Sequence, residues 1–216
     1  MLARAISMSA GYHLDIFDFS GHDTIANEAL ELARSVTLIN PIVSTSIDLL
    51  FNYVRCEEVG QAEKIIGEVA ETVQKAAGSH GWLWRLRLAQ ARAELALARE
   101  DYKGTLRLVE EAIAQSQSRG RVKYQAFGLE TRAKALAALG RKNEAIGEAQ
   151  NAVKLLRPIG APALFLRAAA TLIDLEGNDE LLIEARSAAQ QIMIALPNDE
   201  LRRTFRQAEP VRLVLK

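Results

Sequence analysis

Apolar and small residues recur at steps of three and four along most of the chain. Between positions 82 and 99 the series is Leu86, Ala89, Ala93, Ala96 and Leu97. This spacing places side chains on one face of an α-helix. Similar series follow at 106–113, 122–139 and 144–156, whereas alternating runs of β-branched residues, which would indicate strands, are missing. The pattern predicts an all-α protein.

Proline positions indicate where the helices end. Proline lacks an amide hydrogen and clashes with the preceding helical turn, so it stands at helix boundaries. Residues 42–157 contain no proline and are rich in the strong helix formers Ala, Leu, Glu, Lys, Arg and Gln. The five prolines are Pro41, Pro158, Pro162, Pro197 and Pro210. The central half of the chain is therefore predicted to be helices joined by short turns.

A repeat of about 40 residues runs along the chain. Ala29, Ala70, Ala112 and Ala152 follow one another at spacings of 41, 42 and 40. The segments DFSGHD, EEVGQA, REDYKG, ALGRKN and LEGNDE provide a turn within each repeat. Only a small side chain fits where two helices cross closely, so Ala112 and Ala152 are predicted to be buried. Together these features predict a right-handed α-solenoid of about five helix–turn–helix repeats.

The predicted solenoid is a single domain that spans residues 1–216. The C-terminal segment 198–216 is predicted to fold back as a capping element, because the last pair of a solenoid would otherwise expose an apolar face. Leu201, Phe205 and the aliphatic residues of VRLVLK are the expected cover. The predicted helix pairs are 2–38, 41–77, 81–118, 121–157 and 161–196.

The segment ALGRKNEAIGEAQNAVKLL at 138–156 resembles a tetratricopeptide-type repeat, with Gly140, Ala145, Ala149 and Ala152 on the small-residue positions of that family. Long repeats and endings such as QSQSRG and LLRPIGAPA resemble the C-terminal regions of large bacterial proteins, namely maltose-activator-type ATP-dependent regulators and ATPase-linked cyclases. This resemblance implies a role in bacterial signalling or transcription regulation. The ATPase motif GxxxxGK[ST] is missing, so we expect a fragment of a longer protein or a small stand-alone relative.

Composition narrows the classes of protein that fit. The chain has 216 residues, 49% hydrophobic and 25% charged, with 27 basic and 27 acidic side chains. Its single cysteine excludes a disulfide-stapled secreted scaffold and favours the cytoplasm. No run of about 18 apolar residues is present, so no membrane association is expected. Zero net charge makes a nucleic acid an unlikely partner.

Charge is unevenly distributed along the chain. Residues 1–80 have a net charge of −6, residues 81–160 of +7 and residues 161–216 of −1. Such a field can steer a charged partner or align neighbouring copies. An acidic or amphipathic segment is expected to dock on 81–157, and Arg87 and Lys134 are expected to be surface residues that tolerate reversal to Glu.

The residues that most often carry catalysis or bind metals show no productive spacing. His13, His22, His80 and Cys56 do not form a metal-ligand pattern, and the histidines are expected in turns or on the surface. No pair of titratable groups stands at catalytic spacing. We therefore expect a protein that is not an enzyme and needs no cofactor.

The first helix of each pair is expected to line a concave groove. Polar side chains facing that groove would bind a protein or peptide partner, or a second copy of the chain. An alternative is a small-ligand effector sensor that controls attached domains, which an aromatic cavity near Trp82, Trp84, Tyr124 and Phe127 would support. The predicted partner-binding residues are Asp48, Asn52, Arg55, Arg87, Gln90, Glu94, Phe127, Glu130, Lys134, Arg167, Thr171 and Asp174.

Overall fold

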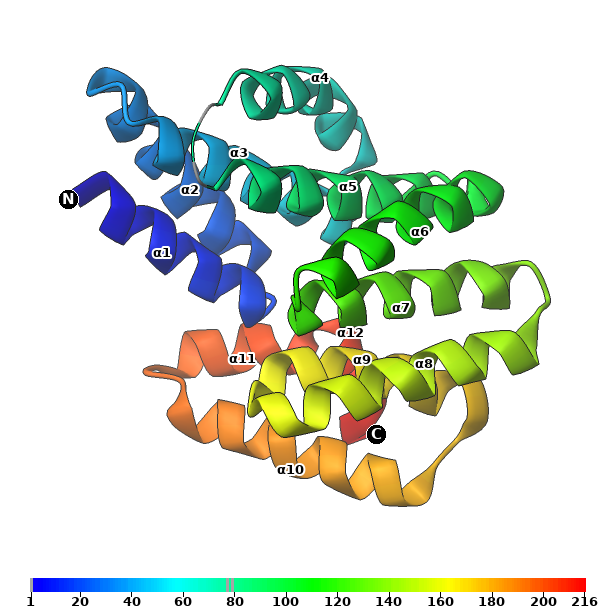
Figure 1. Ribbon diagram of the computed structural model, residues 1–216. Helices are drawn as coiled ribbons and strands as arrows, with labels where there is room; N and C mark the ends of the chain where they lie inside the picture. The colour runs from blue at the N-terminus through cyan, green and yellow to red at the C-terminus, as the bar shows by residue number, and fades with distance from the viewer. Residues whose placement is uncertain (1, 77, 79) are drawn as a thin grey trace. The chain divides into compact units, whose positions relative to one another are not determined.

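The computed structural model describes residues 2–76, 78 and 80–216 (Figure 1). In these residues all regular secondary structure is helical and no strand occurs, which confirms the all-α prediction. Within the same residues, no helix has both the length and the apolar character needed to cross a membrane. The chain divides into two compact units, residues 1–100 and 101–216. Solenoid handedness, the number of repeats and the single-domain assignment stay predictions.

The first unit is built around α3. Helix α3 packs on α1, α2, α4 and α5, and it contributes most of its apolar side chains to the core. Ile47 and Leu50 of α3 are fully buried, and Trp84 and Leu95 of α5 pack in the same cluster. The helices of this unit are α1 (Leu2–Asp15), α2 (Phe19–Ser35), α3 (Ile39–Arg55), α4 (Val59–Lys75) and α5 (Gly81–Ala98).

The second unit is built around α7 and α9. Helix α7 packs on α6, α8 and α9, and α9 in turn packs on α8, α10 and α12. The elements are α6 (Tyr102–Ser118), α7 (Val122–Ala138), α8 (Lys142–Leu156), the 3-10 turn η1 (Arg157–Ile159), α9 (Pro162–Glu176), α10 (Asp179–Ala195), α11 (Asp199–Gln207) and α12 (Glu209–Leu215).

Small residues allow the helices of the second unit to approach closely. Ala112 and Ala152 are both 0% exposed, which confirms their predicted burial. At the crossing of α6 and α7, a Cβ added to Gly128 would lie 2.5 Å from the Ile113 side chain, so only glycine fits there. Ala70 of the first unit is half-buried, so its repeat position is packed less tightly.

The C-terminal segment is helical and three of its apolar side chains are fully buried. Phe205, Val211 and Val214 are 0% exposed. The Asn198 side chain accepts a hydrogen bond from the Leu201 amide at 2.9 Å and so caps α11. Helix α12 packs on α9, α10 and α11.

Candidate functional site

The predicted groove residues lie on α3, α5, α7 and α9, and most of them are buried. Seven of the twelve are buried, and among these Asn52, Gln90 and Glu130 are at most 2% exposed. Asp174 is exposed, and the other four are half-buried. The buried residues are Asn52, Arg87, Gln90, Glu94, Phe127, Glu130 and Thr171. Their polar groups mainly contact one another within each unit.

Two ion pairs tie α3 to α5 in the first unit. Arg87 forms an ion pair with Asp48 and donates to the Ser44 hydroxyl at 2.8 Å. Arg55 donates to both carboxylate oxygens of Glu94, at 2.9 and 3.1 Å. We call Asp48, Arg87, Arg55 and Glu94 the first ion-pair cluster. Arg87 is 9% exposed, so the expectation that it is a surface residue is wrong.

The first cluster also includes an amide and an aromatic ring. Gln90 donates to Glu94 at 3.1 Å, one turn along α5. The Arg55 guanidinium lies 4.6 Å from the centre of the Phe51 ring, a cation–π contact. These contacts fix Arg55 on two sides, which leaves it little freedom to reorganise around a partner.

The second unit has a cluster in which one carboxylate serves two cations. Glu130 of α7 is 2% exposed, and Arg167 of α9 contacts its two oxygens at 2.9 and 2.7 Å. Lys134 Nζ lies 2.9 Å from Glu130, and the Thr171 hydroxyl donates to it at 3.5 Å. Burial would raise the pKa of Glu130, but Arg167 and Lys134 outweigh this and lower it. We call Glu130, Lys134, Arg167 and Thr171 the second ion-pair cluster.

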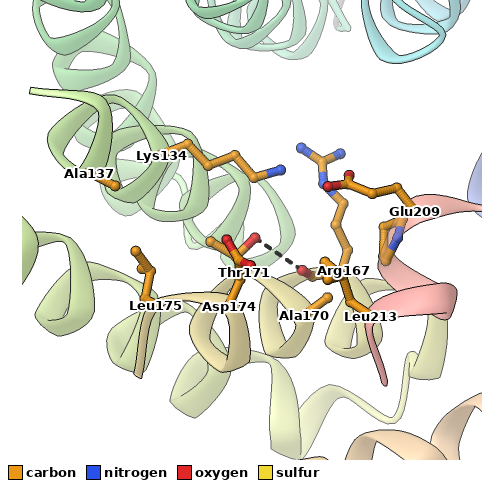
Figure 2. A pocket seen from close by; sticks show the side chains of 10 residues that line it. Lys134, Ala137, Arg167, Ala170, Thr171, Asp174, Leu175, Glu209 and Leu213 are labelled. Atoms are coloured by element: carbon orange, nitrogen blue, oxygen red, sulfur yellow. Dashed lines mark hydrogen bonds between the residues drawn. The ribbon is translucent and has the colours of Figure 1, made fainter. Parts of the chain in front are cut away.

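The second ion-pair cluster borders a pocket of about 190 Å³ between α7, α9 and α12 (Figure 2). Four predicted site residues come together here, namely Lys134, Arg167, Thr171 and Asp174. Figure 2 shows their side chains over the pocket, with Glu209 arriving from α12. The remaining lining residues are Ala137, Ala170, Leu175, Pro210 and Leu213.

Sequence reasoning missed the α12 side of this pocket. It assigned residues 198–216 to a cover and did not place Glu209, Pro210 or Leu213 in a site. One sequence signal was present, because the segment EPVRLVL combines a proline and an acidic residue at its start with apolar residues in helical spacing.

The charges that remain open in the pocket are negative. Arg167 and Lys134 both contact the buried Glu130 carboxylate. Asp174 and Glu209 are exposed, and within the described part of the chain neither makes an ion pair or side-chain hydrogen bond. Among the described residues, the pocket therefore presents apolar walls and two unpaired carboxylates, Asp174 and Glu209.

The prediction that His22 lies in a turn or on the surface is wrong. It lies in the first turn of α2 and is 0% exposed. Among the described residues, neither ring nitrogen has a hydrogen-bond partner. Burial lowers its pKa, although the nearby carboxylates of Asp48 and Asp23 act in the opposite direction. Burial therefore favours the neutral imidazole form of His22.

Metal-ligating side chains do not gather at either cluster. Across residues 2–76, 78 and 80–216, no group of three or more His, Cys, Asp or Glu side chains could hold a metal ion.

Comparison with known proteins does not assign the chain to a family. No family model matches it, and no curated protein is significantly similar to it. The tetratricopeptide-type resemblance therefore stays a prediction.

Proposed function

We propose that the chain is a non-catalytic protein–protein interaction module. In this proposal it acts in the cytoplasm, as the regulatory part of a bacterial signalling or transcription-regulating protein. A partner segment docks at the pocket between α7, α9 and α12 in the second unit. The observation that carries the proposal is the pocket itself, with apolar walls beside a fixed group of charges.

The second ion-pair cluster gives the pocket a preformed wall. Arg167 is held by Glu130 and also lies 4.8 Å from the centre of the Phe127 ring. Immobilising a long side chain at an interface costs about 0.5–1.5 kcal/mol, and a side chain that is already fixed avoids that cost. The arrangement therefore supports binding without a large rearrangement of the pocket.

Pocket size favours a protein segment over a small-molecule effector. Sites for drug-sized ligands enclose roughly 300–1,000 Å³. This pocket has about 190 Å³, and the lining residues that the structure describes include no aromatic ring. A space of this size suits one side chain of a longer segment, whose other residues bind along the adjoining surface.

Site-specific photocrosslinking tests the proposal. A photoreactive residue at Ala137, on the pocket wall, is expected to capture one partner segment from an extract of the source cells. Peptide mapping of the product then identifies that segment. The matched control carries the same residue at Ala114, an exposed position on α6.

A pocket-blocking variant completes the test. Leu175→Trp places a bulky ring in the pocket and is expected to abolish the crosslink, with the helical circular dichroism spectrum unchanged. Docking at this pocket would be contradicted if the same proteins crosslinked to positions 137 and 114. It would also be contradicted if the crosslink at position 137 persisted in Leu175→Trp.

A further inference from the structure

We propose that the pocket receives a lysine or arginine side chain of the partner segment. The aliphatic stem of that side chain packs against the apolar walls, and its cationic group lies beside Asp174 and Glu209. This inference rests on the proposed function and adds the chemistry that the partner must present.

The charge of the pocket selects a cation. Five charged side chains face it or border it, two cationic and three anionic, giving a net charge of −1. The two cations contact Glu130, whereas Asp174 and Glu209 are unpaired within the described residues. An incoming carboxylate would meet these two like charges, which disfavours it, while an incoming cation is complementary to them.

Pocket shape selects a long aliphatic stem. Ala170 and Leu175 of α9 and Leu213 of α12 provide apolar surface, and Asp174 and Glu209 lie on the α9 and α12 sides (Figure 2). Lysine and arginine bury their methylene groups along apolar surface while the charged end stays hydrated. The pocket volume of about 190 Å³ is suited to one long side chain.

The partner charge that the pocket favours is opposite to the one that the net charge of residues 81–160 suggests. Residues 81–160 have a net charge of +7, which favours an acidic partner. Arg87 and Lys134, the cations expected to attract it, instead contact Asp48 and Glu130. Within the part of the chain that the structure describes, the unpaired groups at this pocket are carboxylates, so local pairing outweighs the regional net charge.

Capped pentapeptides of sequence Gly-Ser-X-Ser-Gly provide the test, with X as Lys, Arg, norleucine or Glu. Acetyl and amide caps remove the terminal charges, so X alone differs. Binding to the full chain is followed by the NMR shifts of the Ala137, Ala170 and Leu213 methyl groups. The Lys and Arg peptides are expected to bind most tightly, norleucine less and Glu least. The preference should shrink as salt screens exposed charges.

Charge-neutralising variants locate the cation. Asp174→Asn and Glu209→Gln are each expected to weaken binding of the Lys peptide by about two- to five-fold, the range of an exposed ion pair, and to leave the norleucine peptide unchanged. The control is Glu180→Gln, an exposed carboxylate of α10 outside the pocket. Absence of binding, tightest binding of the Glu peptide, or an equal effect of all three variants would overturn the inference.

The two proposals can fail separately. If the crosslinked partner segment inserts an acidic or apolar side chain, the interaction module stands and the cationic preference falls. If the Lys peptide binds at the pocket but no partner crosslinks at position 137, the preference for a cationic side chain is supported and the proposed function is contradicted.

Discussion

Turns in the two units have the same backbone conformation but different residues. In the first unit a residue with positive φ follows each of four helices, and these residues are Phe17, Thr37, Glu57 and Glu100, at φ 56–65°. In the second unit the corresponding residues are Gly120, Gly140, Gly160 and Gly177, at φ 61–76°. Thr37 and Gly140 share the same closing hydrogen bond, in which the next amide donates to the carbonyl five residues earlier at 2.9 Å.

The difference shows that packing, rather than local preference, sets the turns of the first unit. An L-residue with a side chain pays about 1–2 kcal/mol for the left-handed region, whereas glycine does not. The first unit therefore stores backbone strain at its turns that the second unit avoids. Its helices must supply the compensating stability through burial, as α3 does with fully buried Ile47 and Leu50.

The ion-pair clusters differ in a second way. In the first cluster each cation has its own carboxylate, since Arg87 pairs with Asp48 and Arg55 with Glu94. In the second cluster Arg167 and Lys134 share Glu130. Removing one carboxylate therefore takes a contact from one cation in the first unit and from two cations in the second.

The largest expected effect is from Glu130→Gln. Breaking a buried ion pair by removing one partner costs roughly 3–5 kcal/mol, because a charge remains buried without compensation. Glu130 is 2% exposed and the Arg167 side chain 11%, so solvent cannot replace the lost carboxylate. We expect a clear drop in the free energy of unfolding, measured by urea denaturation followed by circular dichroism.

The matched variant in the first unit is Glu94→Gln. It removes the anion of Arg55 alone, whose guanidinium keeps its contact with the Phe51 ring. The loss should therefore be smaller than for Glu130→Gln. An equal or larger loss for Glu94→Gln would show that sharing a carboxylate does not distinguish the two clusters.

The next effect concerns a glycine turn of the second unit. Gly140 has φ 76°, and a Cβ there would meet no atom within 4 Å, so a substitution acts through the backbone alone. In Gly140→Thr, backbone strain of about 1–2 kcal/mol is offset by roughly 0.5–1 kcal/mol from the reduced entropy of the unfolded chain, so the free energy of unfolding is expected to fall by about 1 kcal/mol. The control is Gly147→Ala within α8, also open around its Cβ, which should stabilise the helix. A neutral Gly140→Thr would contradict the argument from strain.

Lowering the pH through the range where histidine titrates should change the stability of the first unit alone. All three histidines lie within residues 1–100. Burial lowers the pKa of His22 below 6.5; Asp48 and Asp23 oppose this, and His13 and Arg55 add to it. Protonation therefore favours the unfolded chain. The stability that neutral His22 contributes is complete above 6.5 and is lost as pH falls below it, by about 1.4 kcal/mol per unit of pKa shift.

His22→Gln removes this titration. Between about pH 7 and about pH 5, the variant should lose less stability than the parent chain, and His80→Gln, an exposed position, should behave like the parent. Parallel stability curves for the parent and His22→Gln would show that His22 is not held neutral.

Much of the fold was predictable because its signals are local. Apolar spacing predicts helices, and the small residues Ala112 and Ala152 predict two buried positions that the structure confirms. Glycines indicate the turns of the second unit, whereas nothing in Thr37 or Glu57 indicates a left-handed residue. Those turns follow from helix packing, which no short sequence window contains.

The candidate site was less predictable because it depends on pairing across helices. Sequence spacing places Lys134, Arg167 and Asp174 on helices, but it does not show that Glu130 binds both cations and leaves Asp174 open. Glu209 comes from α12, far along the chain from α7, and reaches the pocket through tertiary packing. His22 was misplaced because a histidine near a predicted turn is usually exposed.

The smallest expected effect is from Thr37→Gly, in the turn after α2. Glycine removes the strain of a β-branched residue at φ 56°, about 1–2 kcal/mol, but increases the entropy of the unfolded chain by roughly 0.5–1 kcal/mol. Strain relief outweighs this entropic cost, so the free energy of unfolding should rise by less than about 1 kcal/mol. The neighbouring Val36→Gly is the control, because Val36 has φ −115° and its replacement relieves no backbone strain. If both variants destabilise the chain equally in urea denaturation, the turns of the two units do not differ in stored strain.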